Sequence, residues 1–173
     1  DAEGRYIQAD YALADGPLSV VSLYLPSGSS SEERQAAKFR FMEAFRPRMD
    51  ALRASGRRVI VCADWNIAQR EADLKNWRSN QKNSGFLPEE RAWMAALLQD
   101  GAWVDAYRHL YPDTTDACYT WWSNRGQAWA NNVGWRLVGI GQDRLAGVLH
   151  DLRVLPRSRT HIEDGNDPLV FQQ

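Results

Sequence analysis

Apolar side chains gather in two short runs that predict β-strands. Residues 18–25 (LSVVSLYL) are β-branched, aromatic and aliphatic, and the turn-forming Pro26-Ser27-Gly28 follows them. Residues 58–62 form a second apolar, β-rich run. Both runs have the length of a typical strand rather than of a helix.

Between these runs, apolar residues recur at helical spacing. They are Phe39, Met42, Phe45 and Met49. The pattern predicts a helix from Ser31, with Glu32 and Glu33 in its first turn, to about Ser55, and Gly56 fits its end. The order strand–helix–strand indicates an α/β layered protein.

A polar segment without apolar periodicity, residues 73–86, follows the second strand. Loops this long inside a compact domain are usually functional or disordered. A second helix is predicted from Pro88, with Trp93, Leu97 and Met94 on its inner face and Gly101 after its end.

The rest of the chain predicts shorter elements: one at residues 104–107, and strands at 119–122 and 135–137 that flank a loop. There is no internal repeat or linker-like tract, so residues 1–173 are expected to form a single domain.

Composition and net charge are those of an ordinary globular domain and exclude a polycationic protein. The chain of 173 residues is 44% hydrophobic and 25% charged, ordinary values for a globular domain. A net charge of −1 excludes a polycation, so binding to nucleic acid would need a local basic face. Lys75, Arg78, Lys82 and Arg91 offer one such face, and Arg125 and Arg136 a second. Taken singly, each of these is more simply a solvated surface charge.

The two cysteines and the lack of a long apolar run suggest a compartment. Cys62 lies within an apolar strand and is expected to be a buried thiol, and with Cys118 it suggests no disulfide framework. This favours a reducing, cytoplasmic setting. No apolar run approaches ~20 residues and no signal peptide is evident, so no membrane association is expected.

Candidate chemistry begins where the second strand ends. Asp64 and Asn66 are two residues apart, and in an extended segment such residues point to the same face with Cα atoms roughly 6.5–7 Å apart. A strand end followed by an Asx turn is the commoner explanation for a single Asp. The functional interpretation gains weight from the segments downstream.

Five motifs in order carry a resemblance to a known family. They are Tyr24-Leu25-Pro26-Ser27-Gly28; Ala63-Asp64-Trp65-Asn66; Asn80-Gln81-Lys82-Asn83-Ser84-Gly85-Phe86 with Pro88-Glu89-Glu90-Arg91; Tyr119-Thr120-Trp121-Trp122; and Gly134-Trp135-Arg136-Leu137. Together they resemble the exodeoxyribonuclease III family of abasic-site endonucleases, within the DNase I-like endonuclease/exonuclease/phosphatase superfamily. The resemblance runs from about Glu3 to Leu137.

The resemblance implies a fold and a reaction. The fold would be a four-layer α/β sandwich, incomplete at the N-terminus of this chain. The reaction would be Mg²⁺- or Mn²⁺-assisted hydrolysis of a phosphodiester in double-stranded DNA, at abasic sites and from 3′ ends, by a monomer. Such chemistry needs an oriented water and stabilisation of the charge that develops on phosphorus.

It also implies roles for individual residues. Asp64 would orient or deprotonate the water, Asn66 would hold Asp64 and the phosphate, and Tyr24 would offer its hydroxyl to that phosphate. The expected DNA contacts are Asn80, Lys82, Asn83 and Arg136. The expected pocket for a base-less sugar is Trp121, Trp135 and Leu137. Plain core packing, a solvated loop and an ordinary strand tyrosine are the structural alternatives.

Three departures from the family pattern weaken the catalytic prediction. The family's metal-binding Glu, upstream of the matched region, has no counterpart here, so the metal ligands are unknown and Asp64 and Asn66 are the nearest candidates. Val138 stands where the family has an Asp that orients the catalytic His. In the tail, Gly165 and Asn166 stand where the family has Asp and His.

Residues 138–173 are therefore expected to form a divergent tail. Its abrupt onset is what a change of reading frame would produce, although gradual divergence fits as well. The leading hypothesis is a DNA-repair phosphodiesterase, with this chain a truncated or impaired copy. The alternatives are a catalytically inactive DNA-binding module that retains the DNA-facing surface, and a phosphodiesterase acting on RNA or a small phosphate ester.

Overall fold

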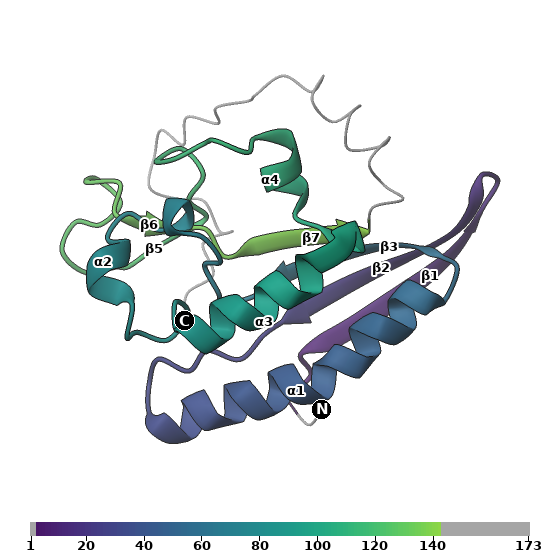
Figure 1. The fold of residues 1–173 in the computed structure, drawn as a ribbon, viewed down its shortest axis with the longest axis horizontal. Coiled ribbons are helices and arrows are strands. Elements are labelled where there is room, and N and C mark those ends of the chain that lie inside the picture. Colours follow the sequence, from purple (N-terminus) through teal and green to yellow (C-terminus); the bar gives the residue numbers. More distant parts are fainter. Residues whose placement is uncertain (1–2, 143–173) are drawn as a thin grey trace.

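The computed structural model describes residues 3–142, which form a mixed five-stranded sheet and a two-stranded sheet (Figure 1). The larger sheet has the strand order β1-β2-β3-β7-β4, in which β2 and β3 are parallel and the other neighbours are antiparallel. Its strands are β1 (Tyr6–Leu13), β2 (Gly16–Tyr24), β3 (Arg58–Asp64), β4 (Trp103–Val104) and β7 (Val138–Gln142). The smaller sheet pairs β5 (Trp121–Trp122) with β6 (Gly134–Trp135).

Two long helices, α1 (Glu32–Ala54) and α3 (Pro88–Leu98), run along one face of the larger sheet (Figure 1). The main core lies between them and strands β2 and β3. Shorter elements complete the described chain: 3₁₀ turns η1 (Glu71–Asp73) and η2 (Gln99–Gly101), and helices α2 (Trp77–Asn80) and α4 (Ala106–Leu110). The predicted α/β class is confirmed.

Helix α1 begins and ends where its sequence predicts. The Ser31 hydroxyl caps it by accepting a hydrogen bond from the Arg34 backbone N–H at 3.2 Å. Its inner face buries Met42, Phe45 and Met49, which recur at helical spacing. The helix ends at Ala54, just before Ser55.

The sheet differs from the prediction in two places. Strand β1 was not predicted, because its Ile7, Tyr11 and Leu13 are exposed and it has no buried alternating pattern. The prediction that Cys62 is a buried thiol is wrong, since Cys62 is exposed. Cys62 pairs in register with Ser22, and neither side chain faces the core that α1 covers.

Some segments expected to be irregular contain regular structure. Within the predicted loop 73–86, α2 forms one helical turn. Residues Val138–Gln142, at the start of the expected divergent tail, form β7 between β3 and β4. The remainder of the expected tail lies outside the described residues. In the part of the chain that is described, no helix is long and apolar enough to cross a membrane.

Candidate functional site: a cleft beside the Asp64–Asn66 turn

Asp64 lies at the carboxyl end of β3, in the middle of the larger sheet. Its register partners are Tyr24 on the parallel strand β2 and Val138 on the antiparallel strand β7. The chain then leaves the sheet, and the Trp65 backbone N–H donates to the Leu137 carbonyl at 2.9 Å. Asp64 therefore stands where strands β2 and β3 end and strand β7 begins.

Asn66 approaches Asp64 through a turn rather than through extended backbone. It adopts a left-handed conformation with φ of 48°, and its backbone N–H donates to Asp64 Oδ1 at 2.9 Å. Its side-chain Nδ2 donates to the Leu25 carbonyl at 2.7 Å. The Asx turn and the proposed site thus coincide, because the turn is what brings the two groups together.

The environment of Asp64 is partly dry. Burial raises the pKa of the Asp64 carboxyl above its ordinary value, and the Asn66 N–H and the Lys38 charge oppose this shift only in part. Among the described residues, the Oδ2 oxygen accepts no hydrogen bond. A carboxylate with a raised pKa and one uncommitted oxygen can accept a proton from water.

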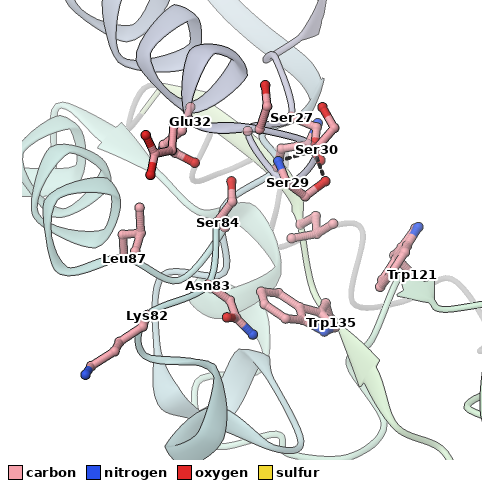
Figure 2. Close-up of a pocket in the computed structure, with 16 residues that line it drawn as sticks. Ser27, Ser29, Ser30, Glu32, Lys82, Asn83, Ser84, Leu87, Trp121 and Trp135 are labelled. Atoms are coloured by element: carbon pink, nitrogen blue, oxygen red, sulfur yellow. Dashed lines mark hydrogen bonds between the residues drawn. The ribbon is translucent and has the colours of Figure 1, made fainter.

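A cleft of about 590 Å³ opens beside this turn, and Figure 2 shows its walls. Trp121, Trp135 and Leu137 line it, and Asn66 lies on its surface. That this wall receives a base-less sugar stays a prediction. The polar segment from Ser27 to Ser31 forms the opposite side, above the tryptophans in Figure 2. The cleft thus has one apolar wall and one hydroxyl-rich wall.

The predicted phosphate-contact loop also borders the cleft. Asn83 and Lys82 are lining residues, and in Figure 2 the Lys82 ammonium points away from Trp135. Asn80 lies behind Asn83, whose Nδ2 donates to Asn80 Oδ1 at 2.7 Å. Asn80 in turn donates to the Asn76 carbonyl at 2.7 Å, so the two amides brace each other.

Arg136 does not occupy the place predicted for it. The side chain is buried, donates from Nε to Asp73 Oδ1 at 2.7 Å and forms an ion pair with Asp105. Arg108 donates to the same Asp73 oxygen at 2.9 Å. The prediction of Arg136 as a DNA contact is therefore corrected: it anchors the segment 134–137, which carries Trp135 and Leu137, from inside the protein.

Tyr24 remains near the strand ends but does not line the cleft. Its ring lies under the Arg5 guanidinium, with 5.2 Å between the Arg5 Cζ and the ring centroid. Its register pairing with Asp64 keeps it next to the carboxylate along the sheet edge. A role toward a phosphate at Asp64 stays a prediction.

A metal site is only partly supported by these residues. Within residues 3–142, no group of three or more His, Cys, Asp or Glu side chains is placed to hold a metal ion. Asp64 supplies one carboxylate, whereas Mg²⁺ takes six oxygen ligands from carboxylates, phosphates and water. The described residues therefore do not form a metal site by themselves.

Sequence reasoning missed two residues beside this site, Lys38 and Glu90. Both are fully buried and form an ion pair at 2.7 Å. Lys38 falls on the apolar stripe of α1, four residues before Met42, and this conflict of charge and pattern was a usable signal. Glu90 occupies the third position of α3, where an acid caps the helix start.

Comparisons with known proteins agree with this geometry. Residues 3–160 match the Endonuclease/Exonuclease/phosphatase family. The chain is 39% identical over 137 residues to the DNA repair nuclease APEX1 of Danio rerio, covering 79% of the chain and 42% of that relative. It is 36% identical over 137 residues to an exodeoxyribonuclease of Bacillus subtilis, covering 79% of the chain and 52% of that relative.

A solved structure supports the same fold. The AP endonuclease LMAP of Leishmania major superposes with a TM-score of 0.73 and 28% identity, covering 85% of this chain and 48% of that one. The chain thus spans about half the length of the relatives it matches. By the family match over most of its residues, and with the abasic-endonuclease resemblance confirmed, the chain belongs to the endonuclease/exonuclease/phosphatase family.

Proposed function

We propose that this chain carries the substrate pocket and the water-orienting carboxylate of a DNA phosphodiesterase of the exodeoxyribonuclease III type. The reaction would be hydrolysis of a phosphodiester in double-stranded DNA, at abasic sites and at 3′ ends. The observation that carries the proposal is the apolar wall of Trp121, Trp135 and Leu137 in a cleft that Asn66 also lines. Sugar and phosphate sites would then adjoin.

The shape of the cleft suits an extruded nucleotide that has lost its base. Flat aromatic side chains can pack against the carbon face of a deoxyribose. The hydroxyls of the Ser27–Ser31 segment can form hydrogen bonds with the sugar-phosphate backbone of the DNA. An abasic nucleotide also costs least to extrude, because it has no base to unstack. These features together favour abasic DNA over intact duplex.

Asp64 is the proposed group that positions and deprotonates the attacking water. Its pKa is raised by burial, which brings the carboxyl closer to the range useful for a general base at neutral pH. Asn66 holds the carboxylate through its backbone N–H, at 2.9 Å from Oδ1. Water bound to the other carboxylate oxygen would be held near a phosphate at the cleft.

The remaining predicted contacts would hold the DNA backbone. Asn83 and Lys82 border the cleft, Asn80 braces Asn83, and Tyr24 stands beside Asp64 along the sheet edge. Amides and a single cation suit phosphate oxygens without reading bases. The protein would therefore recognise the lesion and the backbone rather than a sequence.

Family resemblance implies Mg²⁺ or Mn²⁺ as the cofactor, which would stabilise the charge on the phosphate when bound. The residues described here offer Asp64 as one ligand, so further ligands would come from elsewhere. Action as a monomer, in the cytoplasm, belongs to the same proposal.

A specific observation favours the alternative of a binding module without catalysis. The β3–β7 register pairs Asp64 with Val138, the position at which the family pattern has a carboxylate. A valine there can neither orient a histidine nor stabilise its cation. The chain would then grip abasic DNA through the cleft and leave it intact.

Incision and binding assays separate the two functions. The substrate is a duplex with one tetrahydrofuran abasic analogue, and an intact duplex of the same sequence is the control. The nuclease proposal expects Mg²⁺-dependent incision of the abasic duplex that Asp64→Asn abolishes. If the wild-type chain and Asp64→Asn both bind the abasic duplex selectively and neither incises it, the binding module is supported. Equal affinity for both duplexes and no incision would reject both.

A further inference from the structure

Lys38 of α1 and Glu90 of α3 form an ion pair whose two side chains are completely shielded from solvent. Lys38 Nζ lies 2.7 Å from Glu90 Oε1, and each side chain is 0% exposed. Removing two charges from water costs several kcal/mol per ion, so a buried pair is weak evidence of a stability function. The two charged groups also form hydrogen bonds to other parts of the chain, and these contacts suggest a different role.

Lys38 binds the turn that carries Asp64 and Asn66. Its Nζ donates to the Asn66 carbonyl at 2.7 Å. Asn66 has a positive φ, a conformation that costs energy for a residue with a side chain and persists when surrounding contacts hold it. The ammonium therefore fixes the peptide that follows the side chains proposed for catalysis.

Glu90 binds the loop that lies beside this turn. Its Oε2 accepts from the Gly85 backbone N–H at 2.7 Å and from the Leu87 N–H at 3.0 Å. Gln35, a cleft residue of α1, donates to Glu90 Oε1 at 3.1 Å. The carboxylate thus fixes the backbone just after the predicted phosphate-contact loop.

The turn and the loop also touch each other directly. The Ala68 N–H donates to the Gly85 carbonyl at 2.8 Å. Gly85 has a φ of 91°, and a Cβ at this position would lie 3.1 Å from the Asn66 carbonyl and 3.2 Å from the Trp135 ring. A residue other than glycine would be strained at this φ, and the Asn66 carbonyl and the Trp135 ring would have to yield by a few tenths of an ångström.

We propose that Lys38 and Glu90 are positioning residues that join the Asp64–Asn66 turn and the 83–87 loop into one rigid unit. The pair would keep a constant spacing between the group that orients water and the loop predicted to contact the phosphate backbone. This inference rests on the proposed function only for the roles given to the Asp64–Asn66 turn and the 83–87 loop. A pair that merely fastened α1 to α3 would need neither the Asn66 carbonyl nor the Gly85 N–H.

Hydrogen exchange tests the rigid unit in the wild-type chain without any substitution. Residues that open together exchange with a common free energy of opening. The amides of Asn66, Ala68, Gly85 and Leu87 should therefore share one value. Distinct values for the turn and the loop would overturn the proposal.

A double variant, Lys38→Met with Glu90→Gln, tests which contacts matter. It leaves no buried charge unpaired, and the amide oxygen introduced at position 90 can still accept from Gly85. We expect exchange at Asn66 and Ala68 to accelerate about tenfold or more, since a hydrogen bond from a charged group is lost. Gly85 should stay protected. Arg40→Met, an exposed substitution on the same helix, should change none of these amides.

Kinetics distinguish positioning from simple structural support. In protein that incises abasic DNA, the double variant should lower kcat by about 10- to 100-fold, because small misplacement of a catalytic group is costly. KM should stay within about twofold, and Arg40→Met should match wild type. If the double variant exchanges its Asn66 amide at the wild-type rate and keeps the wild-type kcat, the proposal is overturned. An inactive wild-type chain would contradict the proposed function alone, and the exchange data would still decide this inference.

Discussion

Replacing Asp73 by Asn is the most severe conservative change that the structure predicts. Asp73 is fully buried in η1 and accepts hydrogen bonds from Arg108, Arg136 and the Arg70 backbone N–H. Asp105 completes a cluster of two carboxylates and two guanidinium groups. The cluster is neutral overall, and Asp73→Asn leaves it with an uncompensated positive charge.

The expected loss follows from what each arginine retains. After the change, Arg136 still pairs with Asp105, and Arg108 still donates to the Thr114 carbonyl at 2.6 Å. Within residues 3–142, the Arg108 guanidinium pairs with no second carboxylate. Breaking a buried pair from one side costs about 3–5 kcal/mol. Domains are typically stable by about 5–15 kcal/mol, so this loss is a large share.

Urea unfolding followed by tryptophan fluorescence measures the effect. The midpoint for Asp73→Asn should fall well below wild type with an unchanged slope, which signals lost stability rather than a changed unfolded state. Asp15→Asn is the matched control, because Asp15 forms an exposed pair with Arg58 at 2.7 Å and should change the midpoint little.

Acid titration gives an independent check on the same group. Burial alone would raise the pKa of Asp73, but the hydrogen bonds and charge of Arg136 and Arg108 lower it below its ordinary value. The stabilisation is therefore complete above the ordinary carboxyl pKa and is lost as pH falls through the lower folded pKa. Equal midpoints for Asp73→Asn and Asp15→Asn at neutral pH would refute this account of the cluster.

Four further outcomes are expected. Lys82→Ala should weaken duplex binding uniformly across sequences and reduce the salt slope by about one, as measured by fluorescence anisotropy; an unchanged slope would make Lys82 a solvated charge. Trp135→Ala should reduce the preference for abasic over intact duplex in the same assay, whereas an unaltered preference would contradict the pocket assignment. Because burial raises the pKa of Asp64, the incision rate should fall with decreasing pH at a value above 3.8, and a limb at or below 3.8 would exclude Asp64 as the base. Val138→Asp alone should not increase incision, because Asn166 stands where the family pattern has the histidine that this carboxylate would orient, and an increase would contradict that reasoning.

Local patterns predicted the scaffold of the site well. The strand ending at Asp64, the helix starting after Ser31 and the helix starting at Pro88 depend on periodicity and capping, which are properties of neighbouring residues. The family resemblance grouped Trp121 with Trp135, and both line the cleft, while their role toward a sugar stays a prediction. These inferences need no knowledge of long-range contacts.

The failures share a different physical origin. Arg136 was interpreted as a surface cation because its partners, Asp73 and Asp105, are distant in sequence and carry no local sign of pairing. Cys62 was interpreted as buried because an apolar strand does not reveal which sheet face the helices cover. Strand β1 is mostly exposed on both faces, so its sequence lacks the alternation of apolar and polar residues that predicts a strand.

The two buried charge clusters hold different parts of the chain that border the cleft. Lys38 and Glu90 hold the Asp64–Asn66 turn and the 83–87 loop, while the Asp73 cluster holds the segment 134–137, which bears Trp135 and Leu137. Hydrophobic burial is non-directional and can be satisfied by many arrangements, whereas each buried ion accepts few partners and few geometries. A site that must keep a sugar wall and a carboxylate at fixed spacing gains its accuracy from the second kind of interaction.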